Sequence, residues 1–297
     1  MYPRNFSYHR ASSLAEAARL LAELGSEAKL LAGGQSLIPL MKMRLASPAA
    51  IVDLGHIAGL NYLRCDGDHL SFGSLCRHAD VEHSEVAQGI PILHDCAAGI
   101  ADVQVRNWGT LAGSVAEADP TGDWAPVLLA LETEVGCVGA KGERTLPLAG
   151  FIRDAFTTAL AADEVIREIR VRVPARNSSG AYVAFKRCAP VYASASAAVQ
   201  LALADGVCTD ARIYLGAVGL TPVHAGEAEG ALRGKRVDAK SVAAACDAAA
   251  AAADPQSDQR GSAEYKRNLV RALVAEAVDA AARRAAGTRV EVAHHYA

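Results

Sequence analysis

Two short stretches of the chain combine glycines with hydroxyl side chains, and this combination is typical of loops that bind phosphate groups. The first is Ala32-Gly33-Gly34-Gln35-Ser36, and the second is Thr110-Leu111-Ala112-Gly113-Ser114. Glycine lets the backbone turn tightly, and free peptide N–H groups donate hydrogen bonds to an anion. Neither stretch is the G-x-G-x-x-G fingerprint or a P-loop with its lysine. Taken alone, the glycine pair of the first stretch is also explained as a plain turn.

An acidic loop, Asp119-Pro120-Thr121-Gly122-Asp123, follows the second glycine stretch and opens a helix that we expect over residues 124–131. Asp123 can cap that helix, bind a ribose or ribityl hydroxyl, or do both. Two glycine–hydroxyl loops and an acidic loop in one domain are what a large phosphate-bearing cofactor requires.

The elements around the first stretch are those of a small α/β unit. Residues 14–24 carry apolar side chains at helical spacing, after Ser13 as a helix cap and before Gly25 as a stop. Residues 29–32 are short and apolar and end at the glycine pair, and residues 50–54 form a second such run, so both are predicted strands. Further short strands are expected at residues 69–73, 134–138 and 168–173, with helical pieces between them.

The last part of the chain reads as a separate module after a linker at residues 174–180. Apolar runs at 194–204 and 207–218 flank Asp205-Gly206, a strong hairpin signal. Two alanine-rich helices are predicted at residues 239–253 and 262–286, with Asp254-Pro255 between them.

Composition excludes several classes of protein. A length of 297 residues suggests about two domains, and 30 Lys and Arg against 33 Asp and Glu leave a net charge of −3, which disfavours a nucleic-acid binder. We expect no transmembrane helix, because no apolar run reaches about 18 residues, and no secretion signal. The cysteines number seven, and none are spaced C-x-x-C. They predict a reducing, cytoplasmic setting and no metal or iron–sulfur cluster on this chain.

Three longer motifs carry a family resemblance. They are residues 32–45 (Ala-Gly-Gly-Gln-Ser-Leu-Ile-Pro-Leu-Met-Lys-Met-Arg-Leu), 106–114 (Arg-Asn-Trp-Gly-Thr-Leu-Ala-Gly-Ser) and 118–123 (Ala-Asp-Pro-Thr-Gly-Asp). The chain resembles, over nearly its whole length, the FAD-binding medium subunit of molybdenum hydroxylases. This family includes the bacterial carbon monoxide dehydrogenase medium chain and the flavin portion of xanthine dehydrogenases.

The resemblance implies an α+β fold in two domains. The first is a two-lobed FAD-binding domain of the VAO (PCMH) type at residues 1–175, with lobes at about 1–57 and 58–175. The second, at residues 180–287, is the C-terminal domain of such flavin subunits, a three-stranded antiparallel sheet with helices.

The resemblance also implies non-covalent FAD and a set of residues that contact it, with no catalytic side chain and no metal ligand on this chain. The implied FAD-binding residues are Leu31, Ala32, Gly33, Gly34, Gln35, Ser36, Leu37, Thr110, Leu111, Ala112, Gly113, Ser114, Asp123, Ile166, Lys186 and Tyr192.

The contacts at the flavin ring leave alternatives open. A cation near N1 would stabilise the negative charge of reduced flavin, and Lys186 is the candidate, with Arg187 a competitor. Lys186 is alternatively a solvated strand residue. Tyr192 covers a flavin face or packs in the core.

Two positions depart from the family pattern. Ala112 stands where the family commonly has glycine, so a methyl group is expected to intrude into the second loop. Val191 stands where an aspartate usually precedes the aromatic residue.

The function implied is that of the flavin subunit in a three-subunit enzyme, assembled as a dimer of heterotrimers. Electrons would come from a small [2Fe–2S] subunit, which takes them from a large molybdopterin subunit, and FAD would pass them to an external acceptor. Glu117 favours the carbon monoxide dehydrogenase branch of the family, while the branches of purine and N-heterocycle dehydrogenases stay open as alternatives. The alternatives are a self-sufficient VAO-type flavoprotein oxidase or reductase, and a flavin-free structural partner.

Overall fold

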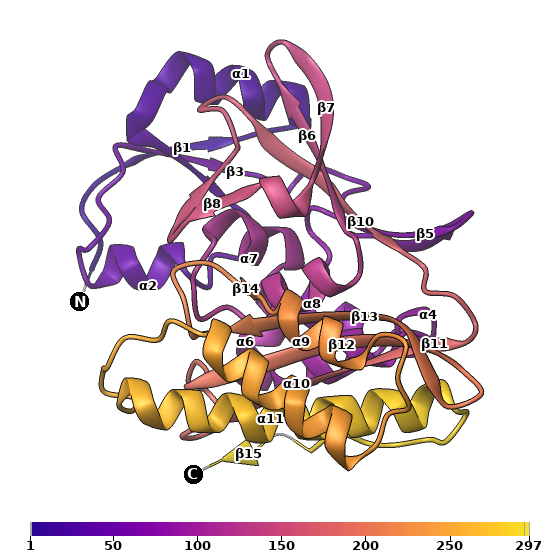
Figure 1. Cartoon of the computed structure of the whole chain (residues 1–297). Coiled ribbons are helices and arrows are strands. Elements are labelled where there is room, and N and C mark those ends of the chain that lie inside the picture. Colours follow the sequence, from indigo (N-terminus) through magenta and orange to yellow (C-terminus); the bar gives the residue numbers. More distant parts are fainter. Residues whose placement is uncertain (1, 294, 297) are drawn as a thin grey trace.

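The computed structural model describes residues 2–293 and the backbone of residues 295 and 296. Its first lobe is a three-stranded parallel sheet in the order β1-β3-β2, covered by helix α1 (Figure 1). The elements are β1 (Ser7–Arg10), α1 (Leu14–Leu24), a 3-10 turn (Gly25–Glu27), β2 (Ala28–Leu31), α2 (Leu37–Lys42) and β3 (Ala50–Asp53). The predicted α/β unit is therefore confirmed, and the first glycine stretch joins β2 to α2.

The second lobe contains a five-stranded antiparallel sheet in the order β4-β5-β10-β6-β7 and a small hairpin, β8-β9. The strands are β4 (Leu63–Asp66), β5 (His69–Gly73), β6 (Glu134–Gly139), β7 (Gly142–Pro147), β8 (Ile152–Asp154), β9 (Thr157–Thr158) and β10 (Val165–Arg172), with a 3-10 turn at Leu148–Gly150. The three strands predicted in this region correspond to β5, β6 and β10.

Six short helices lie between β5 and β6, and they carry the second glycine stretch and the acidic loop. They are α3 (His78–Glu82), α4 (Glu85–Gln88), α5 (Pro91–Gly99), α6 (Val103–Trp108), α7 (Leu111–Glu117) and α8 (Trp124–Ala130). Their apolar sides form the largest core together with the five-stranded sheet.

The C-terminal domain is built on three long antiparallel strands, β11 (Ser178–Lys186), β12 (Ala195–Ala204) and β13 (Val207–Gly216), as predicted. Two-residue strands, β14 (Val223–His224) and β15 (His295–Tyr296), extend the sheet at its two edges. Asp205 and Gly206 have φ angles of 51° and 77°, so the β12–β13 hairpin has the left-handed turn that the Asp-Gly pair predicts.

Both faces of this sheet are buried. Helices α9 (Gly226–Leu232), α10 (Ala239–Ala252) and α11 (Ala263–Ala285) cover one face (Figure 1), and helices α5 and α8 of the second lobe contact the strands on the other. Side chains along β11 alternate accordingly, because Ala181 and Val183 lie in the core under α10 and α11 whereas Tyr182 and Ala184 lie in the core of the second lobe.

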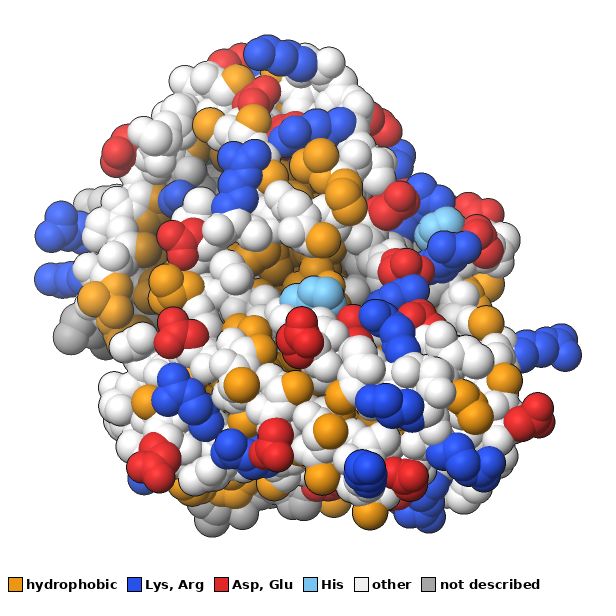
Figure 2. Space-filling view, in the orientation of Figure 1, with side chains coloured by type: hydrophobic (Ala, Val, Ile, Leu, Met, Phe, Trp, Pro, Cys, Tyr) orange, Lys and Arg blue, Asp and Glu red, His pale blue; other side chains and the backbone are white. Residues whose placement is uncertain are grey.

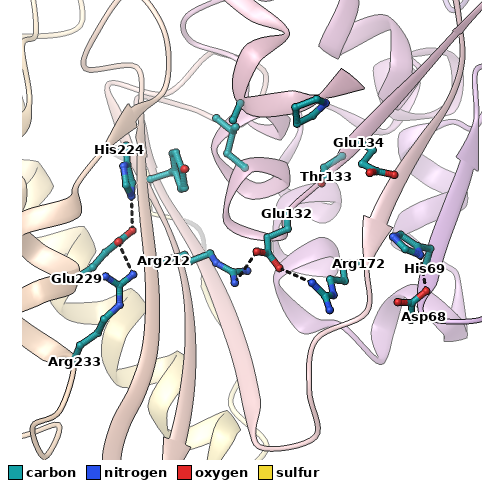
Figure 3. A pocket seen from close by; sticks show the side chains of 14 residues that line it. Asp68, His69, Glu132, Thr133, Glu134, Arg172, Arg212, His224, Glu229 and Arg233 are labelled. Carbon is teal, nitrogen blue, oxygen red and sulfur yellow. Dashed lines mark hydrogen bonds and ion pairs between the residues drawn. The ribbon is translucent and has the colours of Figure 1, made fainter. Parts of the chain in front are cut away.

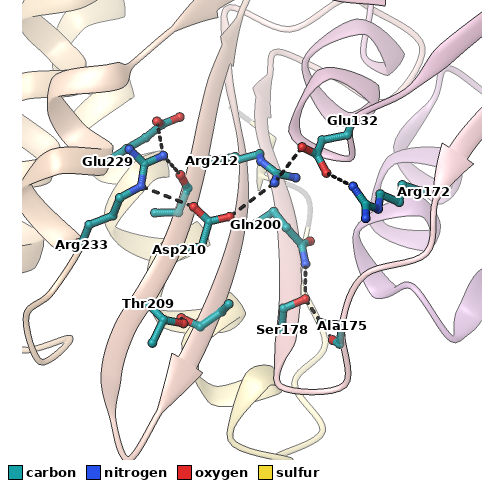
Figure 4. Close-up of polar contacts among 12 residues, drawn as sticks. Glu132, Arg172, Ala175, Ser178, Gln200, Thr209, Asp210, Arg212, Glu229 and Arg233 are labelled. Atoms are coloured by element: carbon teal, nitrogen blue, oxygen red, sulfur yellow. Dashed lines mark hydrogen bonds and ion pairs between the residues drawn. The ribbon is translucent and has the colours of Figure 1, made fainter. Parts of the chain in front are cut away.

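An ion pair joins the two domains at the surface as well. Glu132, just before β6, pairs with Arg212 of β13 at 3.0 Å and with Arg172 at the end of β10 at 3.6 Å (Figure 4). The predicted linker is shorter than expected, since β11 already begins at Ser178. Within the described part of the chain, no helix is both long and apolar enough to cross a bilayer.

Candidate functional site

The first glycine stretch is a half-buried loop with unpaired peptide donors. Gly34 has a φ of +72°, which side chains rarely adopt, and a Cβ there would lie 2.7 Å from Cδ1 of Ile38. The peptide N–H groups of Gly34, Gln35 and Ser36 donate to no acceptor within the described residues. The loop therefore offers three hydrogen-bond donors to a ligand.

The second glycine stretch begins helix α7 and is fixed to the preceding chain. Oγ1 of Thr110 accepts a hydrogen bond from the N–H of Gly113 at 3.1 Å, and the N–H of Leu111 donates to the carbonyl of Cys76 at 3.0 Å. The expectation for Ala112 was wrong, because its side chain is only 3 % exposed and packs in the core. The methyl group points away from the open side of the loop, as does the buried Leu111.

The two glycine stretches lie side by side although they belong to different lobes. A Cβ at Gly33 would overlap the carbonyl oxygen of Trp108 and lie 2.8 Å from Cα of Gly109. A side chain at position 33 would therefore push the loops apart. The structure brings together the two stretches that the sequence singled out.

Asp123 is not a helix cap, which corrects one of the interpretations of this residue. Its backbone is helical and its side chain accepts no capping hydrogen bond. The buried carboxylate instead accepts hydrogen bonds from the hydroxyl of Tyr182 at 2.6 Å and from Nζ of Lys186 at 3.0 Å. Burial, together with the Asp123 charge, raises the pKa of Tyr182 well above its usual value.

Lys186 is buried and paired, so the interpretation as a solvated strand residue was wrong. Its side chain is 1 % exposed, and Nζ donates to Asp123 and to the carbonyl of Gly99 at 2.8 Å. Arg187, the competing cation, is exposed and donates to the carbonyl of Gln259 at 3.2 Å. The buried cation of this region is therefore Lys186.

Tyr192 and Ile166 have very different surroundings. Tyr192 is 44 % exposed and not packed in the core, and the guanidinium carbon of Arg260 lies 5.9 Å from its ring centroid. Partial burial and the nearby carboxylates of Asp119 and Glu117 raise the pKa of Tyr192 to about 12. Ile166 lies in β10 with its side chain buried in the core of the second lobe, and its contact with FAD stays a prediction.

A buried histidine, which the sequence did not single out, supports the second loop. The N–H of His78 donates to the carbonyl of Gly109 at 3.0 Å, and Nδ1 accepts a hydrogen bond from Nε1 of Trp124 at 3.0 Å. Burial lowers the pKa of His78 to about 4, so the ring is neutral near pH 7. Its role is to position the loop.

Tyr182 was also missed, although a signal for it exists. Tyr182 and Lys186 are four residues apart on a strand, so their side chains must point to the same face. A lysine on the same strand face as buried apolar neighbours needs a carboxylate partner, and this reasoning would have pointed to an aspartate in the second lobe.

A cavity of about 820 Å³ lies elsewhere, between the ends of β5, β6 and β10 and strands β13 and β14 (Figure 3). None of the predicted site residues line it. Its charged side chains pair with one another, as His224 does with Glu229 at 2.8 Å and Glu132 with Arg212. It therefore presents no unpaired charge to a ligand. Among the described residues, no group of three or more His, Cys, Asp or Glu could hold a metal ion.

Taken together, the geometry offers free peptide donors from the first glycine loop, which lies beside the second, and a buried ion pair between Asp123, before α8, and Lys186 of β11. Donors of this kind bind a phosphate or pyrophosphate, and a buried cation beside a carboxylate tunes the charge of a bound ring system.

Comparisons with known proteins match nearly the whole chain. Residues 4–175 match the FAD binding domain in molybdopterin dehydrogenase, and residues 180–281 match the CO dehydrogenase flavoprotein C-terminal domain. The carbon monoxide dehydrogenase medium chain of Hydrogenophaga pseudoflava is 37 % identical over 95 % of this chain and 98 % of its own. The 6-hydroxypseudooxynicotine dehydrogenase complex subunit alpha of Paenarthrobacter nicotinovorans is 36 % identical over 99 % of this chain and 100 % of its own.

A solved structure shares the fold as well. Carbon monoxide dehydrogenase from Hydrogenophaga pseudoflava, in a form that lacks the Mo-pyranopterin moiety of its cofactor, matches with a TM-score of 0.93 and 39 % identity, covering 96 % of this chain and 99 % of that one. On the sequence, the fold and these matches, the chain belongs to the family of FAD-binding flavoprotein subunits of molybdenum hydroxylases.

Proposed function

We propose that the chain binds FAD non-covalently, with the pyrophosphate at the two glycine loops. The observation that carries this proposal is the set of unpaired peptide donors at Gly34, Gln35 and Ser36, beside the second loop at Thr110–Ser114. The residues that would hold the cofactor are those predicted from the sequence. The side chains of Leu111 and Ala112 are buried in the core, so these two residues would contribute their backbone.

The flavin ring is proposed to lie near Asp123, Lys186 and Tyr192. When bound, FAD supplies reversible electron transfer, and its reduced form carries negative charge. The Lys186 cation would stabilise that charge, and Asp123 would hold the lysine in place through the contact between Nζ and its carboxylate. No side chain of this chain needs to act as an acid, base or nucleophile.

The partners are proposed to be a small [2Fe–2S] subunit and a large molybdopterin subunit, in a cytoplasmic dimer of heterotrimers. The names of the relatives support the partnership, since they are the medium chain or complex subunit of other dehydrogenases. The domain division proposed is residues 1–175, with lobes at about 1–57 and 58–175, and residues 180–287. Both faces of the C-terminal sheet are covered, which disfavours a self-sufficient oxidase with a substrate site there.

The substrate of the assembled enzyme is not assigned. Relatives of similar identity include a carbon monoxide dehydrogenase medium chain at 37 %, a nicotine-derivative dehydrogenase subunit at 36 % and a glyceraldehyde dehydrogenase medium chain at 35 %. This chain would act on electrons and not on the substrate itself.

A matched pair of variants tests FAD binding at the loops. Gly34→Asp places a side chain at a positive φ, against Ile38, and adds a negative charge where a phosphate should approach, so FAD occupancy should fall more than tenfold. Ala112→Gly should retain FAD and cost about 1–2 kcal/mol of stability, because it removes a buried methyl group and adds backbone entropy to the unfolded chain. FAD per chain, released by acid, and the thermal midpoint are measured for both. Full FAD in Gly34→Asp would show that the first loop is not the pyrophosphate site.

A further inference from the structure

Arg260 contacts Tyr192, one of the residues proposed to lie beside the flavin ring. On the face that Figure 2 shows, charged side chains of both signs are interspersed over the described residues, so a single arginine is judged by the groups that it contacts. The guanidinium carbon of Arg260 lies over the Tyr192 ring, 5.9 Å from its centroid. This distance is within the range of a cation–π interaction.

Tyr192 lies in the irregular connection between β11 and β12, at residues 187–194. Residues 187–192 are all exposed, the tyrosine included. An exposed ring on such a segment is free to change its rotamer, so a lasting contact with a cofactor requires neighbours that fix the ring. The connection therefore needs support from another part of the chain.

The support comes from the turn at residues 256–261, between α10 and α11, which we call the α11 turn. The carbonyl of Arg260 accepts a hydrogen bond from the hydroxyl of Ser194 at 3.1 Å. The carbonyl of Gln259 accepts one from Nη1 of Arg187 at 3.2 Å. With the guanidinium over the tyrosine ring, the α11 turn thus contacts the connection at its first residue, at its last residue and at the tyrosine between them.

The α11 turn is itself held by several hydrogen bonds. Asp258 and Gly261 exchange two peptide hydrogen bonds of 3.1 Å, and the N–H of Arg260 donates to Oδ1 of Asp258 at 2.7 Å. The other carboxylate oxygen of Asp258 accepts a hydrogen bond from Nζ of Lys266, a buried lysine of α11, at 2.8 Å. The same Nζ donates to the carbonyl of Gln256 at 2.9 Å. Because a buried ammonium needs these partners, it fixes the turn relative to α11.

We propose that Arg260 is a positioning residue, which holds the Tyr192 ring in the orientation that contacts the flavin. This inference rests on the proposed function. The guanidinium covers one face of the ring and leaves the other face for the flavin. Arg260 acts through the tyrosine and does not itself touch the cofactor, while Lys266 keeps the α11 turn in place. A tyrosine fixed in this way excludes water from one side of the flavin.

The release of FAD from the intact complex tests the contact. The complex is purified from the native host through the tagged chain, freed of unbound FAD and diluted, and free FAD is measured over time. Tyr192→Ala should release FAD about tenfold faster than the wild type, and Arg260→Met about threefold faster. The double variant should release it no faster than Tyr192→Ala, because Arg260 acts through the ring. Multiplied rates in the double variant, or Arg260→Met at the wild-type rate, would overturn the proposal.

The flavin potential distinguishes positioning from a direct effect of charge. When Tyr192 leaves the flavin, water reaches the ring and stabilises the negative charge of the reduced form. The two-electron potential should therefore rise in Tyr192→Ala and in Arg260→Met. A direct contact between Arg260 and the flavin has the opposite sign, because loss of a nearby cation destabilises the reduced form. A lower or unchanged potential in Arg260→Met contradicts the proposal.

Arg271→Met is the matched control. Arg271 also lies on the α11 side of the domain, where it pairs with Asp247 at 2.9 Å, and its replacement removes the same charge. The release rate and the potential of Arg271→Met should equal those of the wild type. Changes as large as those in Arg260→Met would overturn the proposal, because the loss of any charge in this domain would then have the effect.

The wild type and Tyr192→Ala separate the two levels of inference. If the wild-type complex holds no FAD, or if Tyr192→Ala changes neither the release rate nor the potential, the proposed function or its placement of the flavin ring fails together with the role of Arg260. If Tyr192→Ala changes both quantities and Arg260→Met changes neither, only the role of Arg260 fails.

Discussion

Two buried ion pairs hold β11 against the second lobe, one near each end of the strand. Near the start, Arg284 of α11 binds Asp95 of α5 through two hydrogen bonds of 2.6 and 2.9 Å. At the far end, Lys186 binds Asp123 through one hydrogen bond of 3.0 Å. Tyr182 contacts both, since its N–H donates to Asp95 at 3.1 Å and its hydroxyl donates to Asp123.

The two pairs differ in what the cation can do. Arg284 also donates to the carbonyls of Gly180 and Val290, and an arginine keeps its charge in a protein under all ordinary conditions. The Lys186 ammonium, by contrast, is a compact charge on a flexible stem, held by Asp123 and by the carbonyl of Gly99. The comparison teaches that the Asp95 pair fixes the domains together, whereas the Asp123 pair has the role that we propose for it beside the flavin.

The largest expected effect is on stability at the Asp95 pair. Asp95→Ala leaves the Arg284 charge buried without its partner, so it should cost about 3–5 kcal/mol of unfolding free energy. FAD per folded chain should not change. Denaturant unfolding measures the cost, and Asp279→Ala, which breaks the exposed Asp279–Arg283 pair on the same helix, should cost less than about 1 kcal/mol. Equal costs in the two variants would refute a structural role for Asp95.

An acid titration should show a loss of stability that comes from His78, which contacts the second glycine loop. The pKa of His78 is about 4 in the folded protein and about 6.5 in the unfolded chain, so below pH 6.5 protons bind preferentially to the unfolded chain. Stability is fully present above pH 6.5 and falls by about 3 kcal/mol as the pH drops to 4. The unfolding free energy of His78→Gln, measured from pH 7 to pH 4, should fall less steeply. Parallel curves would assign the loss to other groups.

Tyr182→Phe tests whether the two pairs are independent. It removes the hydrogen bond to Asp123 but keeps the peptide N–H that binds Asp95. Loss of a hydrogen bond to a charged group should cost about 1.5–3 kcal/mol, less than Asp95→Ala. Chemical denaturation of Tyr182→Phe, of Asp95→Ala and of the variant that carries both changes gives the coupling free energy between the two sites. A cost that matches Asp95→Ala would mean that the two pairs act as one unit.

The smallest effect expected is electrochemical and confined to the Asp123 pair. Lys186→Met should lower the two-electron flavin potential by tens of millivolts, where about 30 mV corresponds to about 1.4 kcal/mol. Asp123→Asn should raise it, and Arg284→Met should leave it unchanged. Potentiometric titration of the FAD-loaded complex measures all three. A shift of the same size in Arg284→Met would erase the distinction between the pairs.

Local patterns in the sequence predicted most of the fold. The alanine-rich helices expected at 239–253 and 262–286 are Ala239–Ala252 and Ala263–Ala285, because Asp238 and Ser262 cap them and apolar spacing maintains them. Helix α9 was not predicted, since two glycines in its seven residues weaken the local signal. It is held by tertiary contacts, such as the hydrogen bond from the N–H of Ile213 to Glu229.

The site was predictable where it is local and not where it is assembled from distant segments. The glycine loops were evident from their local sequence motifs, and the structure places them together. Asp123 was predicted to cap the helix, to bind a ribose or ribityl hydroxyl, or to do both, but the structure shows it bound to groups 59 and 63 residues away. The Asp95–Arg284 pair spans 189 residues. Contacts of this length depend on which strand face meets which helix, and a single sequence carries no local signal for that.

The division of the sheet faces has a consequence for anyone who wishes to cut the protein at its domain boundary. Tyr182, Ala184 and Ala198 of the C-terminal strands complete the core of the second lobe. A fragment ending at residue 175 would lack these side chains, and the apolar sides of α5 and α8 that pack against the sheet would be exposed to water. A nick in the short connection between β10 and β11 should instead leave two pieces that stay bound, which makes this connection a place to split the chain into a complementing pair.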